Sequence, residues 1–183
     1  MYRVAVCEDT PRAAEQNRAA ACRILDGKGR MRGRDYDVEV FHAAAPLMER
    51  LTANLNAYQL LLLDIQLDGD NCVELARFLR EHQVNASIIY ITDHPDFALD
   101  SFPTYPLEYL IKPVDEERLA AAVDWDWRQR QIRKKRPVLR VGGRVFPLNE
   151  ITYLEISGRK TAIHTKEERI EYAVPLSKLK EDF

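Results

Sequence analysis

The stretch Leu60-Leu61-Leu62-Leu63-Asp64 decides the fold, because an apolar run of strand length ends in a carboxylate. Three further apolar runs also end at polar side chains: residues 3–7 lead into Glu8-Asp9, residues 87–91 into Thr92, and residues 107–111 into Lys112-Pro113. In a parallel α/β sheet such points are the carboxyl ends of the strands, where ligands bind. The sequence therefore predicts three acids, one hydroxyl and one lysine along one edge of one sheet.

Strand and helix patterns alternate through the first 125 residues. The strand-like runs are about 2–7, 36–41, 60–63, 87–91 and 107–111. Helices are expected from Pro11 to about Gly27, from Pro46 to about Leu55, after Asn71, near Phe97–Phe102, and from near Asp115 into a basic stretch. Thr10 and Asn71 are the expected capping residues, and Glu74 completes a capping-box pattern with Asn71. This (βα)5 alternation predicts a doubly wound α/β domain over residues 1–125, with helices on both faces of a parallel sheet.

The pattern changes after Pro137. Residues 138–141 and 144–147 flank Gly142-Gly143, which predicts a hairpin with a tight turn. Further strands are expected near 151–156, 162–165 and 170–173, and a helix start near 175–180. We therefore expect a basic helix end or linker over 126–137 and a partial all-β segment over 138–183.

The charge is unevenly distributed along the 183 residues, whose formal net charge is −2. Residues 125–136 contain six basic side chains and one acid, Asp126. This basic stretch joins the α/β pattern to the all-β pattern. Cys7, Cys22 and Cys72 are too widely separated for a metal motif or a disulfide framework, so we expect reduced thiols. No apolar run approaches the ~20 residues that cross a bilayer, and no signal-peptide pattern opens the chain. A cytoplasmic protein without a membrane partner is expected.

The predicted sheet edge suits phosphoryl chemistry. A carboxylate accepts a phosphoryl group only when a cation neutralises the approaching phosphate, and Mg²⁺ prefers oxygen ligands. The candidate metal ligands are Glu8, Asp9, Asp64 and the backbone carbonyl of Gln66. Lys112 would compensate the charge on the transferred group, and the Thr92 hydroxyl would hydrogen-bond to it. Catalysis at such a site is positioning and charge stabilisation.

This order and spacing resembles the receiver domain of bacterial two-component response regulators, which has a flavodoxin-like fold. The resemblance covers about residues 1–125 and implies that Asp64 is the phosphoacceptor and that Glu8 and Asp9 hold Mg²⁺. It also implies that Thr92 and Tyr109 are a switch pair and that the Lys112–Pro113 bond is cis. A sensor histidine kinase would be the partner, and the face of the fourth and fifth helices would form a phosphorylation-dependent homodimer. Asp68 and Cys72 depart from the proline and glycine that many receivers have at those positions.

The segment after Pro137 resembles the first half of a LytTR-type DNA-binding domain. The matching run is Gly142-Gly143-Arg144, Ile151-Thr152-Tyr153-Leu154-Glu155, Arg159-Lys160 and Ile163-His164. The stretch 93–99 is typical of receivers joined to that module. The resemblance implies promoter DNA as a partner, transcriptional output, and contacts from Arg159 and Lys160. Because it covers about 45 residues, we expect the sequence to be cut before the later strands of the module.

Two other functions compete with this interpretation. A receiver with a protein-binding output would leave the 138–183 segment without a role in reading DNA. A phosphatase of the haloacid-dehalogenase type also uses an Asp nucleophile, but there the nucleophile comes first and a second Asp follows two residues later. Here the acidic pair precedes Asp64 and Gln66 stands at the later position, so we expect no enzyme activity beyond self-phosphorylation and dephosphorylation.

Overall fold

The computed structural model describes all residues except 68–69, 135–137, 159 and 176–183. The chain separates into two compact units, Met1–Arg128 and Gln129–Phe183. The boundary between them falls inside the last helix of the first unit, within the linker that was expected over 126–137.

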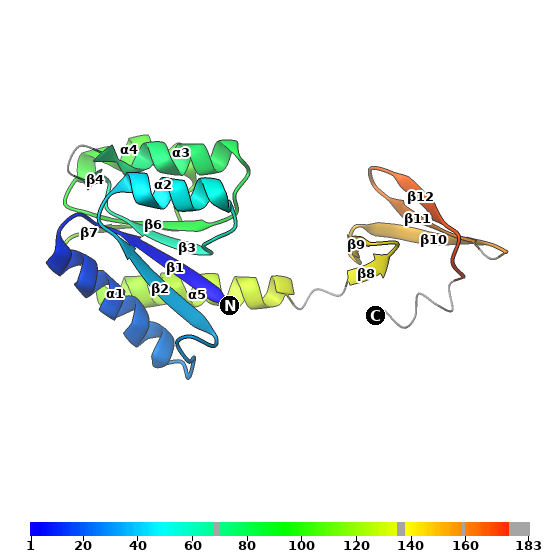
Figure 1. The fold of residues 1–183 in the computed structure, drawn as a ribbon, viewed down its shortest axis with the longest axis horizontal. Helices are drawn as coiled ribbons and strands as arrows, with labels where there is room; N and C mark the ends of the chain where they lie inside the picture. Colours follow the sequence, from blue (N-terminus) through cyan, green and yellow to red (C-terminus); the bar gives the residue numbers. More distant parts are fainter. Residues whose placement is uncertain (68–69, 135–137, 159, 176–183) are drawn as a thin grey trace. The chain divides into compact units, whose positions relative to one another are not determined.

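The first unit is built on a five-stranded parallel sheet (Figure 1). Its strands are β1 (Tyr2–Cys7), β2 (Tyr36–Phe41), β3 (Leu60–Leu63), β6 (Ser87–Thr92) and β7 (Glu108–Ile111). Their spatial order is β2-β1-β3-β6-β7, so the chain crosses over between β2 and β3 and winds in both directions. The prediction of a doubly wound α/β domain is confirmed.

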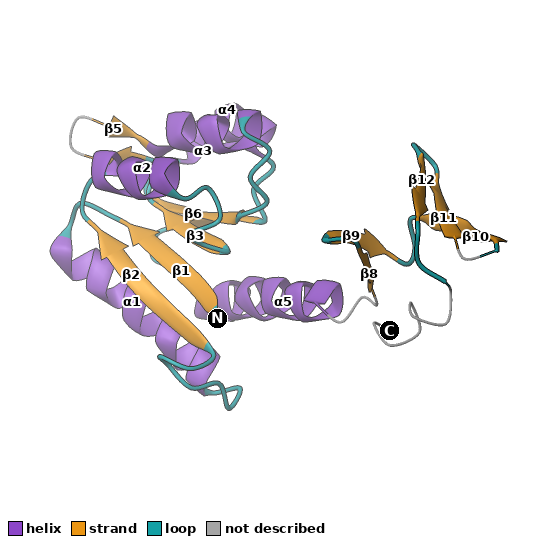
Figure 2. Ribbon diagram, turned by 45° about the vertical axis from the view of Figure 1, so that its right-hand side comes forward, coloured by secondary structure: helices purple, strands orange, loops and turns teal. Residues whose placement is uncertain are grey.

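Helices cover both faces of this sheet (Figures 1 and 2). The elements are α1 (Pro11–Asp26) and α5 (Glu116–Lys134) on one face, and α2 (Ala44–Ala53), α3 (Cys72–Glu81) and α4 (Ala98–Ser101) on the other. Successive side chains of a strand point to opposite faces, so Leu61 and Leu63 enter the core beneath α2 and α3. Leu60 and Leu62 enter the second core, beneath α1 and α5. This two-sided burial explains why the β3 run has no polar alternation.

Several local features differ from the sequence-based expectation. The strands β4 (Gln66–Leu67) and β5 (Asp70–Asn71) pair antiparallel after β3, and two-residue strands carry no periodicity to detect. Helix α2 begins at Ala44 rather than at Pro46, because a proline in the first helical turn lacks only an N–H that would be unpaired there.

The two expected helix caps behave differently. Asn71 caps α3 by accepting the Val73 backbone N–H at 2.7 Å. Thr10 precedes α1, but its hydroxyl donates to the Asp9 carboxylate at 3.3 Å and caps no backbone N–H. The capping-box contact of Glu74 is likewise absent from the described contacts, because the Glu74 carboxylate pairs with Arg77 instead.

The second unit consists of antiparallel strands. The hairpin of β8 (Val138–Val141) and β9 (Arg144–Pro147) turns at Gly142 and Gly143, whose φ angles are 57° and 81°. Positive φ at both central residues is the requirement of a type I′ turn. The strands β10 (Ile151–Ser157), β11 (Lys160–Thr165) and β12 (Arg169–Tyr172) form a three-stranded sheet in sequence order. The helix start expected near 175–180 lies outside the described residues beyond Pro175.

Within the part of the chain that the structure describes, no helix combines the length and the apolar character needed to span a bilayer.

Candidate functional site

The carboxyl ends of β1, β3, β6 and β7 meet at one edge of the parallel sheet (Figure 1). The backbone ladder continues past the strand ends and fixes the residues that follow. The Asp64 N–H donates to the Cys7 carbonyl at 2.9 Å, and the Lys112 N–H donates to the Thr92 carbonyl at 2.9 Å. These bonds hold the side chains of neighbouring strands within reach of one another, as the sequence predicts.

Lys112 lies between two buried carboxylates. Its Nζ donates to Asp64 Oδ2 at 2.7 Å and to Glu8 Oε2 at 2.8 Å. Both acids are almost inaccessible, with 7% of Asp64 and 1% of Glu8 exposed. A third acid, Asp93, is more exposed and places Oδ2 4.0 Å from the same ammonium. The structure thus gathers three carboxylates around one cation.

Burial and pairing set the charge state of this cluster. Burial raises the pKa of Glu8 above its usual value, although the hydrogen bond and charge of Lys112 act in the opposite direction. Burial also acts to lower the pKa of Lys112, but its hydrogen bonds to Asp64 and Glu8 outweigh that effect and raise it. Lys112 therefore remains charged throughout the physiological range and compensates the acids that it binds.

The second oxygen of Asp64 has a different environment. Asp64 Oδ1 is buried, and it has no hydrogen-bond partner among the residues that the structure describes. A buried carboxylate oxygen without a partner is unusual, because no hydrogen bond offsets the free-energy cost of removing it from water. Asp64 thus presents one oxygen held by Lys112 and one oxygen that is available to an electrophile or a cation.

The donor chemistry around Asp64 suits Mg²⁺. Glu8, Asp9 and Asp64 supply carboxylate oxygens, which are the ligands that Mg²⁺ prefers, and the unpaired Asp64 Oδ1 is one of them. Asp9 is partly exposed and accepts the Thr10 hydroxyl at 3.3 Å. Among the described residues no three acid, His or Cys side chains form a preformed cation cage, since Lys112 already binds Glu8 and Asp64. Gln66 lies in β4 opposite Asn71, and its role as a ligand stays a prediction.

Thr92 and Tyr109 both contact the backbone of His94. Thr92 is fully buried, and its Oγ1 accepts the His94 N–H at 3.3 Å. The Tyr109 hydroxyl donates to the His94 carbonyl at 2.6 Å. Burial, followed by the charges of Asp64 and Asp96, raises the pKa of Tyr109, so its hydroxyl stays protonated as a donor. The predicted switch pair is therefore joined through one residue of the β6–α4 loop.

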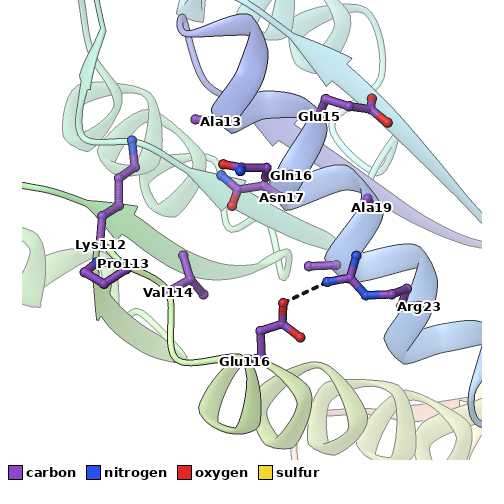
Figure 3. A pocket seen from close by; sticks show the side chains of 11 residues that line it. Ala13, Glu15, Gln16, Asn17, Ala19, Arg23, Lys112, Pro113, Val114 and Glu116 are labelled. Atoms are coloured by element: carbon purple, nitrogen blue, oxygen red, sulfur yellow. Dashed lines mark hydrogen bonds and ion pairs between the residues drawn. The ribbon is translucent and has the colours of Figure 1, made fainter.

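A recess of about 540 Å³ lies on the α1 side of Lys112. Figure 3 shows Gln16 and Asn17 of α1 facing the segment that carries Lys112 and Pro113. The Arg23 guanidinium pairs with the Glu116 carboxylate at 2.8 Å along the rim (Figure 3). The Lys112–Pro113 peptide bond is cis, as expected. Lys112 thus contributes both to the carboxylate cluster and to the wall of this recess.

Sequence reasoning missed part of the site. Asp93 follows Thr92 directly, and its place beside a strand end could have identified it as a neighbour of Lys112. The role of the His94 backbone could not have been found, because a main-chain acceptor has no residue-type signal. Of the two candidate DNA contacts, Arg159 lies outside the described residues. Lys160 is paired with the Glu171 carboxylate at 2.7 Å.

Residues 4–124 match the family model of the response regulator receiver domain. The transcriptional regulatory protein NatR of Bacillus subtilis is 28% identical over 160 residues, which cover 81% of this chain and 66% of NatR. The sensory transduction protein LytT of Bacillus anthracis is 31% identical over 99 residues, covering 54% of this chain and 40% of LytT. The transcriptional regulatory protein LytR of Staphylococcus aureus is 30% identical over 87 residues, covering 47% and 35%. The chain spans less than two thirds of the length of these relatives.

Solved structures share the fold of the first unit. A response regulator receiver domain protein from Clostridium thermocellum superposes with a TM-score of 0.58 at 17% identity, over 72% of this chain and 98% of that chain. The response regulator TrrA of Thermotoga maritima, solved in complex with Mg(2+)-BeF, gives a TM-score of 0.56 at 23% identity. The match covers 69% of this chain and 99% of the TrrA chain.

Proposed function

Because the chain belongs to the response regulator receiver domain family, we propose that Asp64 accepts a phosphoryl group from a sensor histidine kinase. The observation that carries this proposal is the environment of Asp64. One carboxylate oxygen is bound by Lys112 at 2.7 Å, and the other is buried without a partner. The first contact supplies compensating charge, and the second oxygen has no protein contact to give up when a phosphoryl group and its cation approach the carboxylate.

The transfer is a simple exchange of bonds. An oxygen–phosphorus bond forms at Asp64 while the phosphorus–nitrogen bond of the donor phosphohistidine breaks, and the released imidazole keeps the electron pair and takes up a proton. Lys112 neutralises part of the charge on the transferred group. Mg²⁺, held by Glu8, Asp9, Asp64 and the Gln66 carbonyl, would supply further positive charge to the phosphoryl oxygens. The solved complex of TrrA with Mg(2+)-BeF supports the choice of this cation.

We infer that phosphorylation changes the partners of Thr92 and Tyr109. The added charge of about −1.5 to −2 attracts the Thr92 hydroxyl away from the His94 N–H. Tyr109 then leaves the His94 carbonyl and turns toward the space beside Thr92. The face formed by α4, β7 and α5 would pair with a second copy. Its exposed apolar side chains, Leu99, Phe102 and Tyr105, support this surface as the contact.

The second unit would supply a transcriptional output through DNA binding of the LytTR type. The similarity to NatR and LytR, which are both transcriptional regulatory proteins, supports this proposal. One observation favours a protein-binding output instead. The basic side chains Arg144, Lys160 and Arg169 are paired with Glu168, Glu171 and Glu155 respectively, so their charge is already compensated.

A mobility-shift titration decides between these outputs. We expect the chain to bind two unrelated duplexes of equal length with similar affinity, because three basic side chains of its described β-strands are already paired with acids. The affinity should fall steeply between about 50 and 200 mM salt, as phosphate contacts require. Sequence-selective binding would identify a base-reading module and contradict this expectation, and the absence of any binding would favour a protein partner.

The phosphoacceptor assignment is tested by intact mass spectrometry after incubation with Mg²⁺ and acetyl phosphate. The wild-type chain should gain one phosphoryl group, and Asp64→Asn should gain none. Asp93→Asn is the matched control, because it removes a neighbouring acid 4.0 Å from Lys112 but leaves Asp64 in place. Equal labelling of wild type and Asp64→Asn would show that the acceptor lies elsewhere.

A further inference from the structure

The segment around α4 is joined to the domain by the partly buried Phe97, which packs against the core, and by polar groups. It runs through the 3₁₀ turn η1 (Pro95–Phe97), α4 and the 3₁₀ turn η2 (Phe102–Thr104). Its buried side chains are those of Ser101 and Thr104, whereas Leu99 and Phe102 are 79% and 70% exposed. A four-residue helix is too short to be stable by itself. The position of this segment therefore depends on the packing of Phe97 and on the hydrogen bonds of Thr104, since the Ser101 hydroxyl donates to the Ala98 carbonyl inside the segment.

A buried hydrogen bond joins this segment to the central sheet. Thr104 Oγ1 donates to the Ser101 carbonyl at 2.6 Å and lies 3.0 Å from the Tyr90 hydroxyl. Because the single hydroxyl proton of Thr104 is already donated, Tyr90 is the donor in the second bond. Burial raises the pKa of Tyr90 to about 12, so the donor is protonated at physiological pH. Both residues are fully buried.

The backbone of Thr104 is bound from the opposite side. Arg80 at the end of α3 donates Nε to the Thr104 carbonyl at 2.6 Å. Its Nη1 donates to the carbonyls of Val84 at 2.8 Å and Ala86 at 3.0 Å, just before β6 begins. Thr104 is thus fixed to α3 by its main chain and to β6 by its side chain.

Tyr90 also contacts the predicted switch residue. It lies in β6 two residues before Thr92, so both side chains are on the same face of the sheet. Tyr90 is opposite Tyr109 in the register of β6 and β7, and the two rings are 5.9 Å apart at 52°. Tyr90 therefore touches Tyr109 with its ring and Thr104 with its hydroxyl.

We propose that Tyr90 and Thr104 are positioning residues for the switch, and that their hydrogen bond passes a rearrangement of Tyr109 to the segment from η1 to η2. When Tyr109 leaves the His94 carbonyl, the packing of the Tyr90 ring changes on that side. The hydrogen bond then makes Thr104, and with it the exposed Leu99 and Phe102, respond to the same event. This inference rests on the proposed phosphorylation of Asp64 and names the link from that site to the exposed apolar surface.

Hydrogen–deuterium exchange of residues 98–105 tests the link in the 183-residue chain, with and without Mg²⁺ and beryllofluoride. In wild type, beryllofluoride should change the exchange rates of this segment. Tyr90→Phe keeps the ring and removes the hydroxyl, and Thr104→Val keeps the shape and removes the acceptor. The measured quantity is the ratio of the exchange rates of this segment with and without beryllofluoride. In both variants the departure of this ratio from one should be at least threefold smaller than in wild type. Tyr58→Phe is the matched control, since it removes another buried tyrosine hydroxyl, which donates to Glu39, and it should keep the wild-type ratio.

The readout separates coupling from simple destabilisation, because a purely structural loss accelerates exchange equally in both conditions and leaves the ratio unchanged. If a single variant is unstable, the double variant of Tyr90→Phe and Thr104→Val removes both partners of the bond together. Fluorine-19 NMR of bound beryllofluoride reports occupancy of Asp64. Suppose beryllofluoride is bound at Asp64, but the ratio of exchange rates in the variants equals that of wild type, or wild type shows no change in exchange. Either result overturns this inference and leaves the proposed function standing. Absence of bound beryllofluoride in wild type overturns the proposed function and this inference with it.

Discussion

Lys112 compensates the charge of two buried acids in the absence of a phosphoryl group. Its ammonium lies 2.7 Å from Asp64 Oδ2 and 2.8 Å from Glu8 Oε2. The sequence predicts this meeting, because each residue directly follows a strand and parallel strands end at one edge. The unpaired Asp64 Oδ1 could not be predicted, since residue type does not show which of two carboxylate oxygens is bound.

Removing Lys112 should raise the pKa of Glu8 further. Burial raises this pKa above its ordinary value, while the hydrogen bond and charge of Lys112 lower it, so Lys112→Met leaves only the weaker hydrogen bond from the Thr10 N–H to oppose burial. Carbon-13 NMR of the Glu8 carboxyl during a pH titration measures the change. Arg23→Gln is the control, because Arg23 pairs with the exposed Glu116. An unchanged or lower pKa in Lys112→Met would contradict this electrostatic account.

The same shift fixes the sign of a stability change. The pKa of Glu8 is higher in the folded chain than its ordinary value of 4.5. Its contribution to stability is therefore complete below that value and is lost as the pH rises through the folded pKa. In Lys112→Met the loss should extend to a higher pH than in wild type.

At the scale of elements, strands with a continuous apolar sequence were predictable, whereas a segment positioned by tertiary hydrogen bonds was not. The β3 run identifies itself by four apolar residues in succession. A helix is also predicted near Phe97–Phe102, and the structure forms α4 there but exposes Leu99 and Phe102. It buries Ser101 and Thr104 instead, because tertiary hydrogen bonds determine the position of this segment and leave no periodic signal.

The second half of α5 is fixed by a buried acid. Asp126 is 2% exposed and accepts the hydroxyls of Tyr2, at 2.7 Å, and Ser87. Asp126→Ala would leave two hydroxyls without this acceptor, so the free energy of unfolding should fall by about 2–3 kcal/mol. Urea denaturation measures it. Asp37→Ala removes an exposed acid paired with Arg32 and should change it by less than about 1 kcal/mol. Equal losses would show that Asp126 does not anchor the helix.

In the whole molecule, we expect occupancy of Asp64 to control association. Sedimentation velocity with Mg²⁺ and beryllofluoride should show a shift from monomer toward dimer. Phe102→Ser should weaken the shift at least tenfold, because Phe102 is among the most exposed apolar side chains of the α4 face. Tyr153→Ser is the control, since it removes an exposed aromatic side chain from the second unit. A wild-type chain that stays monomeric with Asp64 occupied would contradict dimerisation through this face.

The organisation into an α/β unit and a β unit was predictable, because the hydrophobic period changes after Pro137. The compensation of charge in the second unit was not, because Lys160 and Glu171 are eleven residues apart and meet only across β11 and β12. Pairing between strands depends on register, and a list of basic residues does not show it.

The central claim is that Asp64 is the phosphoacceptor, and chemical trapping tests it most directly. Borohydride reduces an aspartyl phosphate to homoserine, so the chain is treated with Mg²⁺ and acetyl phosphate, reduced and digested. The account predicts homoserine at position 64 in the peptide that contains the Leu60–Leu63 run, and an unmodified Asp93. Homoserine at Asp9 or Asp93, with Asp64 intact, would contradict it.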